Sequence, residues 1–81
     1  MQVAVHFYSY FKELTGCPSA SVEVPAAASI EQLLQILFSR YPKIEPMKKS
    51  MLVAVGVEYQ PKEYVLKPDE EVSLFPPVQG G

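Results

Sequence analysis

The residues best suited to chemistry are the last seven of the chain, where an aromatic residue and two prolines precede two glycines. The run consists of Phe75, Pro76, Pro77, Val78, Gln79, Gly80 and Gly81. Proline lacks the backbone N–H that a strand needs, so the two prolines end the preceding strand and favour an extended backbone. We therefore expect 76–81 to form an extended, flexible tail that is inserted into another protein. The alternative is a frayed end without a role.

The two glycines that close this tail suit one kind of chemistry. A carboxylate is a poor electrophile, but once it is adenylated its carbonyl carbon accepts a sulfur or nitrogen nucleophile. Because Gly80 and Gly81 lack side chains, the terminus fits a narrow channel and the carbonyl carbon stays unhindered. On this interpretation Gly81 is the reacting group, and other proteins supply the catalysis.

The remaining reactive side chains form no catalytic set. His6, the only histidine, lies within a predicted strand and far in sequence from any acid, so we expect a structural role. Cys17, the only cysteine, has no basic neighbour to activate its thiol, so we expect an ordinary loop residue. One histidine and one cysteine cannot form a metal site, and no glycine-rich phosphate loop is present. Three acids at 69–71 form either a solvated turn or a docking patch for a basic partner.

Length and composition indicate one small folded domain. The chain has 81 residues and is 48% hydrophobic, which argues against disorder. A net charge of −2 gives no footprint for nucleic acid or an anionic membrane, so we expect neither as a partner. No apolar run approaches the roughly 20 residues of a membrane span, and no signal pattern opens the chain. A single cysteine fits a reducing compartment, so the cytosol is the expected location.

Hydrophobic patterning predicts two strands, a helix and two to three further strands. Strands are expected at 3–8 and 20–24, with a helical turn at 9–15 between them. Ser29 and Gln32 have the spacing of a capping box, an apolar stripe follows every three or four residues, and Pro42 ends the helix, so we expect it over 29–41. A polar connection at 43–50 leads to a buried strand at 51–57.

The last part of the domain is expected to contain a turn at 58–62, a short edge strand at 64–66 and a final strand at 71–75. This order predicts an α+β fold over 1–75, a mixed four- or five-stranded sheet with one helix on one face. The first strand should be central, with the last strand beside it. On the alternation of the last strand, Phe75 faces away from the helix.

Several segments resemble the small subunit of molybdopterin synthase, the MoaD family of sulfur carriers. The ending 72–81 carries the most specific resemblance. The segment Val5-His6-Phe7-Tyr8 and the following 11–16 are similar to that family's first strand and its Arg/Lys-Glu-Leu-x-Gly turn. The segment 51–57 is similar to its Leu-x-x-Ala-Val-Asn strand. Two positions depart from the family pattern, Gly56 in place of asparagine and Asp69 in place of a turn glycine, which aspartate tolerates better than most residues.

The resemblance implies a ubiquitin-like β-grasp fold and a carrier rather than an enzyme. It implies that a ubiquitin-activating-type enzyme consumes ATP to adenylate Gly81, that a sulfur donor protein converts Gly81 to a thiocarboxylate, and that this chain binds no cofactor itself. The sulfur then passes to cyclic pyranopterin monophosphate in the large synthase subunit, within a heterotetramer of two small and two large subunits.

The resemblance also makes Phe75 a candidate anchor for a partner, with His6 and Tyr8 at the border of the same surface. Ordinary packing of Phe75 against Tyr8 is the alternative. Three other functions stay open: a sulfur carrier for thiamine thiazole or for tRNA thiolation, a ubiquitin-like modifier attached to lysines, and a non-covalent binding module.

Overall fold

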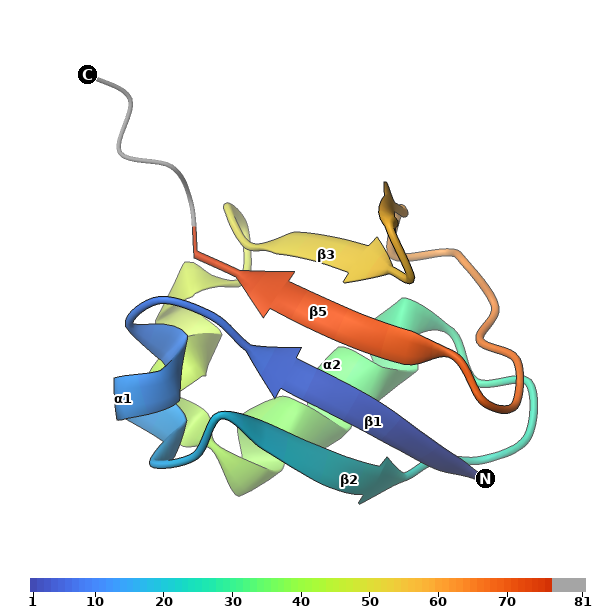
Figure 1. Ribbon diagram of the computed structural model, residues 1–81, viewed down its shortest axis with the longest axis horizontal. Helices are drawn as coiled ribbons and strands as arrows, with labels where there is room; N and C mark the ends of the chain where they lie inside the picture. The colour runs from blue at the N-terminus through green and yellow to red at the C-terminus, as the bar shows by residue number, and fades with distance from the viewer. Residues whose placement is uncertain (77–81) are drawn as a thin grey trace.

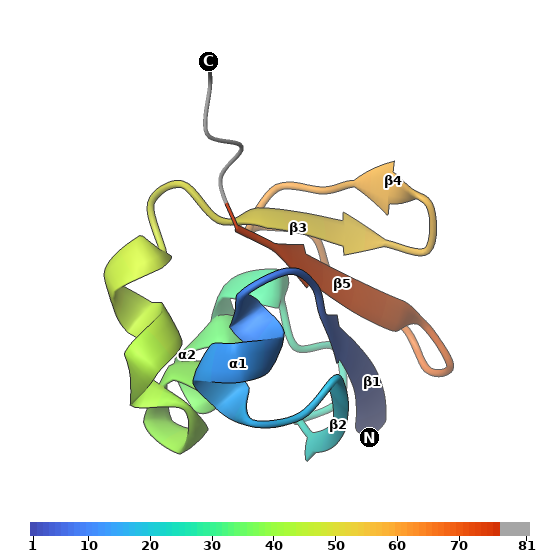
Figure 2. The same cartoon turned by 60° about the vertical axis from the view of Figure 1, so that its left-hand side comes forward.

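The computed structural model describes residues 1–76 and has the α+β architecture expected from the sequence. Its elements are β1 (Gln2–Phe7), α1 (Phe11–Thr15), β2 (Ser19–Glu23), α2 (Ile30–Arg40), the 3₁₀ helix η1 (Pro42–Met47), β3 (Leu52–Val55), β4 (Glu58–Tyr59) and β5 (Glu71–Phe75). One twisted sheet forms one layer, and α2 with η1 forms the other (Figures 1 and 2). Across 1–76, none of the helices has the length and apolar character needed to cross a bilayer.

The sheet has five strands in the order β2-β1-β5-β3-β4. The two ends of the described chain meet at its centre, because β1 and β5 pair in parallel while every other pair is antiparallel. The prediction that the last strand lies beside the first is thus confirmed. Because β5 lies between β1 and β3, Phe7 pairs with Leu74 on one side and Leu52 pairs with Phe75 on the other.

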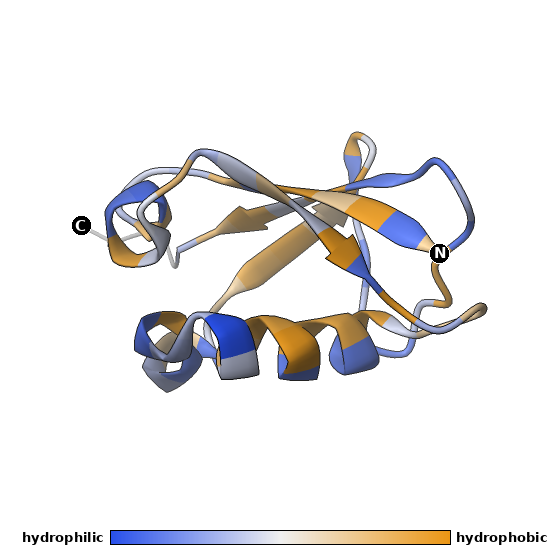
Figure 3. Ribbon diagram, turned by 90° about the horizontal axis from the view of Figure 1, so that it is seen from below, coloured by the Kyte–Doolittle hydropathy of each residue, from blue (hydrophilic) through white to orange (hydrophobic). Residues whose placement is uncertain are grey.

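The core lies between the sheet and α2 (Figure 3). Alternate residues of β1 and β5 point into it, and the apolar stripe of α2 covers them. The buried residues of this contact are Val3, Val5, Phe7, Val72 and Leu74 from the sheet and Ile30, Leu33, Leu34, Leu37 and Phe38 from the helix. Each such side chain contributes about 1.5–3 kcal/mol by leaving water. The open face of the sheet, opposite α2, carries the other half of each strand's side chains.

The predicted capping box of α2 is confirmed. The backbone N–H of Gln32 donates to Ser29 Oγ at 3.2 Å, and the backbone N–H of Ser29 donates to Gln32 Oε1 at 2.9 Å. The helix ends at Arg40, before Pro42, as the restriction on the residue preceding proline requires.

The expectation of a polar connection at 43–50 is wrong for its first half. Residues Pro42–Met47 form η1, because Pro42 has its φ already fixed near the helical value and lacks only an N–H that the first turn leaves unpaired. Ile44 is fully buried there, against the end of the core. The polar residues around Ile44 make the segment resemble an exposed connection, although this one apolar side chain packs into the core.

The predicted turn at 58–62 and edge strand at 64–66 are also wrong. Glu58 and Tyr59 pair with β3 as β4, across a two-residue loop that starts at Gly56 with φ +62°. A glycine at that first loop position suits a tight hairpin. The third strand therefore ends at Val55, and Val57 at the hairpin tip is 99% exposed. In 64–66, Val65 makes only an isolated bridge with Ser29.

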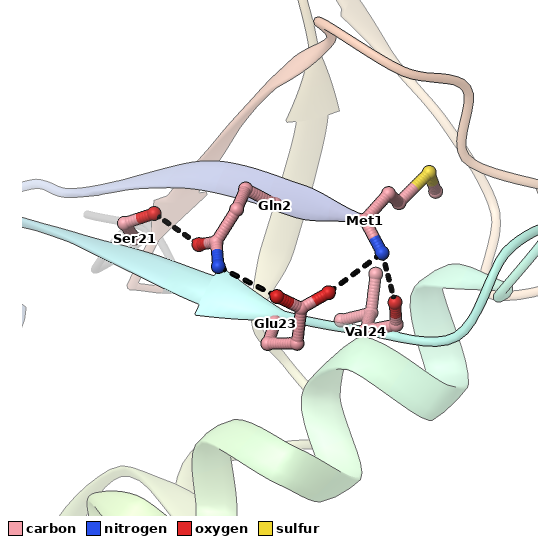
Figure 4. A network of polar contacts seen from close by, with 5 residues as sticks. All are labelled: Met1, Gln2, Ser21, Glu23 and Val24. Carbon is pink, nitrogen blue, oxygen red and sulfur yellow. Dashed lines mark hydrogen bonds and ion pairs between the residues drawn. The ribbon is translucent and has the colours of Figure 1, made fainter.

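A polar network joins the start of β1 to β2 at the edge of the sheet (Figure 4). The Met1 amine donates to Glu23 Oε2 at 2.7 Å, and Gln2 Nε2 donates to Glu23 Oε1 at 2.6 Å. Ser21 Oγ donates to Gln2 Oε1 at 2.6 Å. The hydrogen bond from the amine lowers the pKa of the Glu23 carboxyl. Because Gln2 pairs directly with Glu23, these contacts stabilise the register of the edge strand β2.

Candidate functional site

An aromatic cluster lies on the open face of the sheet, where β5 ends. The rings of Tyr8 and Phe75 stack with centroids 4.7 Å apart and an interplanar angle of 12°. Tyr59 approaches Phe75 edge-on at 6.2 Å. Stacked and edge-to-face pairs of this kind contribute roughly 0.5–1.5 kcal/mol beyond the area they bury. The strand pairing sets this geometry, since the backbone N–H of Tyr8 donates to the Leu74 carbonyl at 3.2 Å.

The cluster stays open to solvent. Tyr8 is 43% exposed and Tyr59 is 66% exposed, while Phe75 is half-buried between them. Leu52, the cross-strand partner of Phe75, is 36% exposed and extends the same surface. We call Tyr8, Leu52, Tyr59 and Phe75 the aromatic patch. An apolar surface of this kind next to polar residues is typical of a protein–protein contact.

Phe75 therefore packs as the structural alternative predicted, against Tyr8, and the stacked pair still presents ring surface to a partner. The sequence did not reveal Leu52 or Tyr59 as members of the patch. The signal that could have found Tyr59 is the Gly56 hairpin loop, which predicts a strand immediately after it. Leu52 becomes a neighbour of Phe75 only through pairing between strands distant in sequence.

His6 has a partner that its sequence context did not suggest. His6 Nε2 lies 2.7 Å from Glu71 Oε1, because the parallel register places Glu71 beside Ala4, diagonally across from His6. His6 is far from this acid in sequence, as expected, but the parallel pairing of β1 with β5 brings the two side chains together. Both side chains are solvent-accessible, and an exposed pair of this kind contributes about 0–1 kcal/mol. The pair lies on the open face, next to the aromatic patch along β1 and β5.

One acid of the run at 69–71, Glu70, is engaged within its own turn. Glu70 accepts hydrogen bonds from Tyr64 Oη at 2.6 Å and from the Lys67 backbone N–H at 2.7 Å. The bond to the Glu70 carboxylate raises the pKa of Tyr64. Asp69 has φ +70°, the left-handed conformation expected where the resembling family has glycine. These contacts favour the solvated turn, and docking of a basic partner there stays a prediction.

Cys17 lies in the loop between α1 and β2, as expected. It is half-buried, and its Sγ is 3.9 Å from Tyr41 Oη. Burial raises the pKa of Tyr41. Across 1–76, no group of three or more histidine, cysteine or acidic side chains could hold a metal ion.

The tail begins beside the aromatic patch. Pro76 directly follows β5, outside the strand, and is buried. The other predicted tail residues lie outside the described part of the chain; they are Pro77, Val78, Gln79, Gly80 and Gly81. The structure therefore brings together Tyr8 and Phe75, with His6 nearby on the same face.

The sequence pattern of the ThiS family matches residues 5–81, which include both the aromatic patch and the two final glycines. The chain belongs to the ThiS family. It is similar to proteins named molybdopterin synthase sulfur carrier subunit. The one from Caenorhabditis briggsae is 32% identical over 100% of this chain and 99% of that protein, and the one from Chlamydomonas reinhardtii is 31% identical over 100% of both. The human one is 30% identical over 99% of this chain and 94% of that protein.

Solved structures confirm the fold of this ThiS-family chain. SAMP1 from Haloferax volcanii matches with a TM-score of 0.88 at 20% identity over 100% of both chains. A putative molybdopterin converting factor subunit 1 from Pyrococcus furiosus matches with a TM-score of 0.87 at 24% identity over 96% of this chain and 99% of that one. The expected ubiquitin-like β-grasp fold is thus confirmed.

Proposed function

We propose that this chain is the sulfur carrier subunit of molybdopterin synthase and that Gly81 carries the sulfur. The observation that supports this most is the match, along essentially the whole length, to ThiS-family relatives that bear that name. The match includes the segment with Gly80 and Gly81, and within residues 1–76 no group of three or more histidine, cysteine or acidic side chains could hold a metal ion. The chain is then the reagent, and its partners supply the catalysis.

The proposed reaction begins at the Gly81 carboxylate. One carboxylate oxygen attacks the α-phosphorus of ATP on a ubiquitin-activating-type enzyme, and pyrophosphate leaves. A sulfide-equivalent nucleophile from a sulfur donor protein then attacks the acyl carbon, and AMP leaves with the original oxygen. The resulting thiocarboxylate sulfur attacks a carbon of cyclic pyranopterin monophosphate in the large synthase subunit, and the carbon–oxygen bond at that carbon breaks, with the electron pair leaving on the oxygen. Water hydrolyses the thioester that forms, which returns the carboxylate and leaves the sulfur on the pterin.

The aromatic patch is the proposed docking surface for the large subunit. Phe75 is its anchor, because it is held from both sides by Tyr8 and Tyr59 and immediately precedes Pro76. An anchor rigidly held in the free protein loses little conformational freedom when it binds. In this proposal Pro76, Pro77, Val78 and Gln79 contact the channel of the large subunit, and His6 lies at the border of the interface. A solved structure from Helicobacter pylori, a complex of subunits 1 and 2 of molybdopterin-converting factor, has the same fold with a TM-score of 0.71.

Intact-mass analysis tests the proposal directly. The chain is incubated with ATP, the activating enzyme and a sulfur donor, and its mass should increase by the difference between sulfur and oxygen. Addition of the large subunit and cyclic pyranopterin monophosphate should then return the original mass and produce molybdopterin. A carrier that gains sulfur but transfers it only to a thiazole synthase or to tRNA would contradict the assignment.

A modifier function predicts a different product. If the chain were a ubiquitin-like modifier, cell extracts should contain isopeptide adducts between Gly81 and lysines of other proteins. Absence of such adducts, together with recovery of the large subunit as the main co-purifying protein, would support the carrier function.

A further inference from the structure

The charges of this chain are separated along its long axis. Five of the seven basic residues lie in α1, at the end of α2, and in or just after η1. These five, which we call the basic end, are Lys12, Arg40, Lys43, Lys48 and Lys49. Only Glu13 and Glu45 of the nine acidic residues lie in the same segments. Although the net charge is −2, the segments that contain these five residues are positively charged and the rest of the chain is negatively charged.

The basic end is next to the base of the tail. Figures 1 and 2 show α1, η1 and the loop into β3 at the end of the sheet where β1 and β5 finish. Pairing of Leu52 with Phe75 brings the loop that carries Lys48 and Lys49 to the last residue of β5. On the other side, Tyr8 stacks on Phe75, and α1 with Lys12 follows Tyr8 after a short turn.

The lysines of this end are available to a partner. Lys48 and Lys49 are exposed, as are Lys12 and Lys43. Within residues 1–76, the only salt bridge in these segments is the 3.9 Å contact of Lys48 Nζ with Glu45, between two side chains that are about half exposed. Arg40 is more restricted, since it donates to the Ser21 carbonyl at 3.3 Å and lies over the Tyr41 ring.

We infer that the basic end guides the tail into the adenylating partner by docking on an acidic protein surface around the entrance of that partner's channel. The inference rests on the proposed function and adds the chemistry of the partner surface. Complementary charge mainly accelerates encounter, which matters most for a partner that binds and releases the carrier in every cycle. A stable complex with the large subunit depends instead on the aromatic patch. A nucleic acid is a poorer fit, because the rest of the chain is acidic.

Charge reversal at two adjacent lysines provides the test. The double variant K48E/K49E is compared with K62E/K67E, which makes the same change of net charge away from the tail at two other exposed lysines. The adenylating enzyme from the same organism is assayed for carrier-dependent exchange of pyrophosphate into ATP. We expect K48E/K49E to raise the KM for the carrier about tenfold at low salt, with kcat unchanged and the control within about twofold of wild type.

Salt and a second variant complete the design. The effect of K48E/K49E should disappear near 1 M salt, where the screening length falls to about 3 Å. K12E, on a different element, should show a smaller effect of the same kind. Both double variants should bind the large subunit with unchanged affinity, which also shows that they fold.

Three results would overturn this inference while leaving the proposed function intact. They are an equal change of KM in both double variants, no change in either, and a loss of large-subunit binding in K48E/K49E alone. Failure of the unaltered chain to be adenylated would instead refute the proposed function, and this inference with it.

Discussion

Tyr8 and Phe75 come from opposite ends of the chain and stack face to face at 4.7 Å. Their contact is possible because β1 and β5 run parallel and adjacent, so the residue that follows β1 meets the last residue of β5. The stacked rings lie on the open face of the sheet, at the end of β5 where Pro76 follows. Their contact links the position of Pro76, the first tail residue, to the central pairing of β1 with β5.

Deletion of Gly81 should abolish sulfur transfer without changing the stability of the domain. In the described residues 1–76, the strands and helices lie within 2–75, so removal of the last residue should leave the thermal unfolding midpoint unchanged. The measurement is formation of molybdopterin in the reconstituted reaction, with V57A, at an exposed position of the hairpin tip, as the control that keeps both glycines. If the shortened chain still converted the pterin precursor, Gly81 would not be the reacting group.

Substitution of Phe75 by alanine should weaken binding of the large subunit by about 2 kcal/mol or more, as expected for an aromatic anchor. Titration calorimetry with the purified large subunit measures the loss. The control is V57A, which shortens an apolar side chain that is 99% exposed but lies outside the aromatic patch. If F75A and V57A bound the large subunit with equal affinity, Phe75 would not be part of the interface.

The His6–Glu71 pair should contribute little to stability. Both side chains are solvent-accessible, so a double-mutant cycle of H6A and E71A should give a coupling free energy below about 1 kcal/mol. Urea unfolding of the four proteins measures it. A coupling of several kcal/mol would show that the pair is a structural element and not part of a solvated surface.

Substitution of Ile44 by alanine should cost about 2–5 kcal/mol of the free energy of unfolding, because the side chain is fully buried under η1. K43A, one residue earlier and exposed, is the matched control and should stay near wild type. Urea unfolding distinguishes the two. A small effect of I44A would mean that η1 is not anchored to the core.

Stability at alkaline pH should depend on Tyr64. Its pKa is raised by the hydrogen bond to Glu70, so the neutral hydroxyl is favoured more in the folded than in the unfolded state. This contribution is fully present below the unfolded pKa of about 10 and is lost as pH rises through the folded value. Wild type should therefore lose stability more steeply than Y64F above about pH 10.

A matched variant separates this effect from general alkaline unfolding. Y59F removes a hydroxyl that makes no hydrogen bond within residues 1–76, so its profile measures the effect of removing a tyrosine hydroxyl outside the Tyr64–Glu70 bond. Identical profiles of Y64F and wild type in urea unfolding at each pH would contradict the role of the Tyr64–Glu70 bond.

Local signals in the sequence were sufficient for α2 and for the core faces of β1 and β5. The capping box of Ser29, the apolar stripe and Pro42 are all encoded within one segment. They needed no knowledge of distant residues. The left-handed conformation of Asp69 was expected instead from the resemblance, because the family has glycine at that position.

The remaining features depend on pairing between distant segments. Tyr59 joins the aromatic patch because β4 pairs with β3, and Glu71 reaches His6 through the parallel register. Ile44 is buried because η1 packs against the end of the core, although its neighbours in sequence are polar. Periodicity identifies which face of a strand is apolar, but it does not identify the strand beside it.

The central place of β5 has a mechanical consequence. A pull on the chain beyond Phe75 acts along β5, whose hydrogen bonds to β1 on one side and to β3 on the other must then slide together. A force along the strand loads the hydrogen bonds of both pairings at once. This arrangement resists rupture better than a force that breaks the bonds of one pairing one after another. On the proposed function, a partner that draws the terminus into a channel and releases it would therefore leave the domain behind it folded.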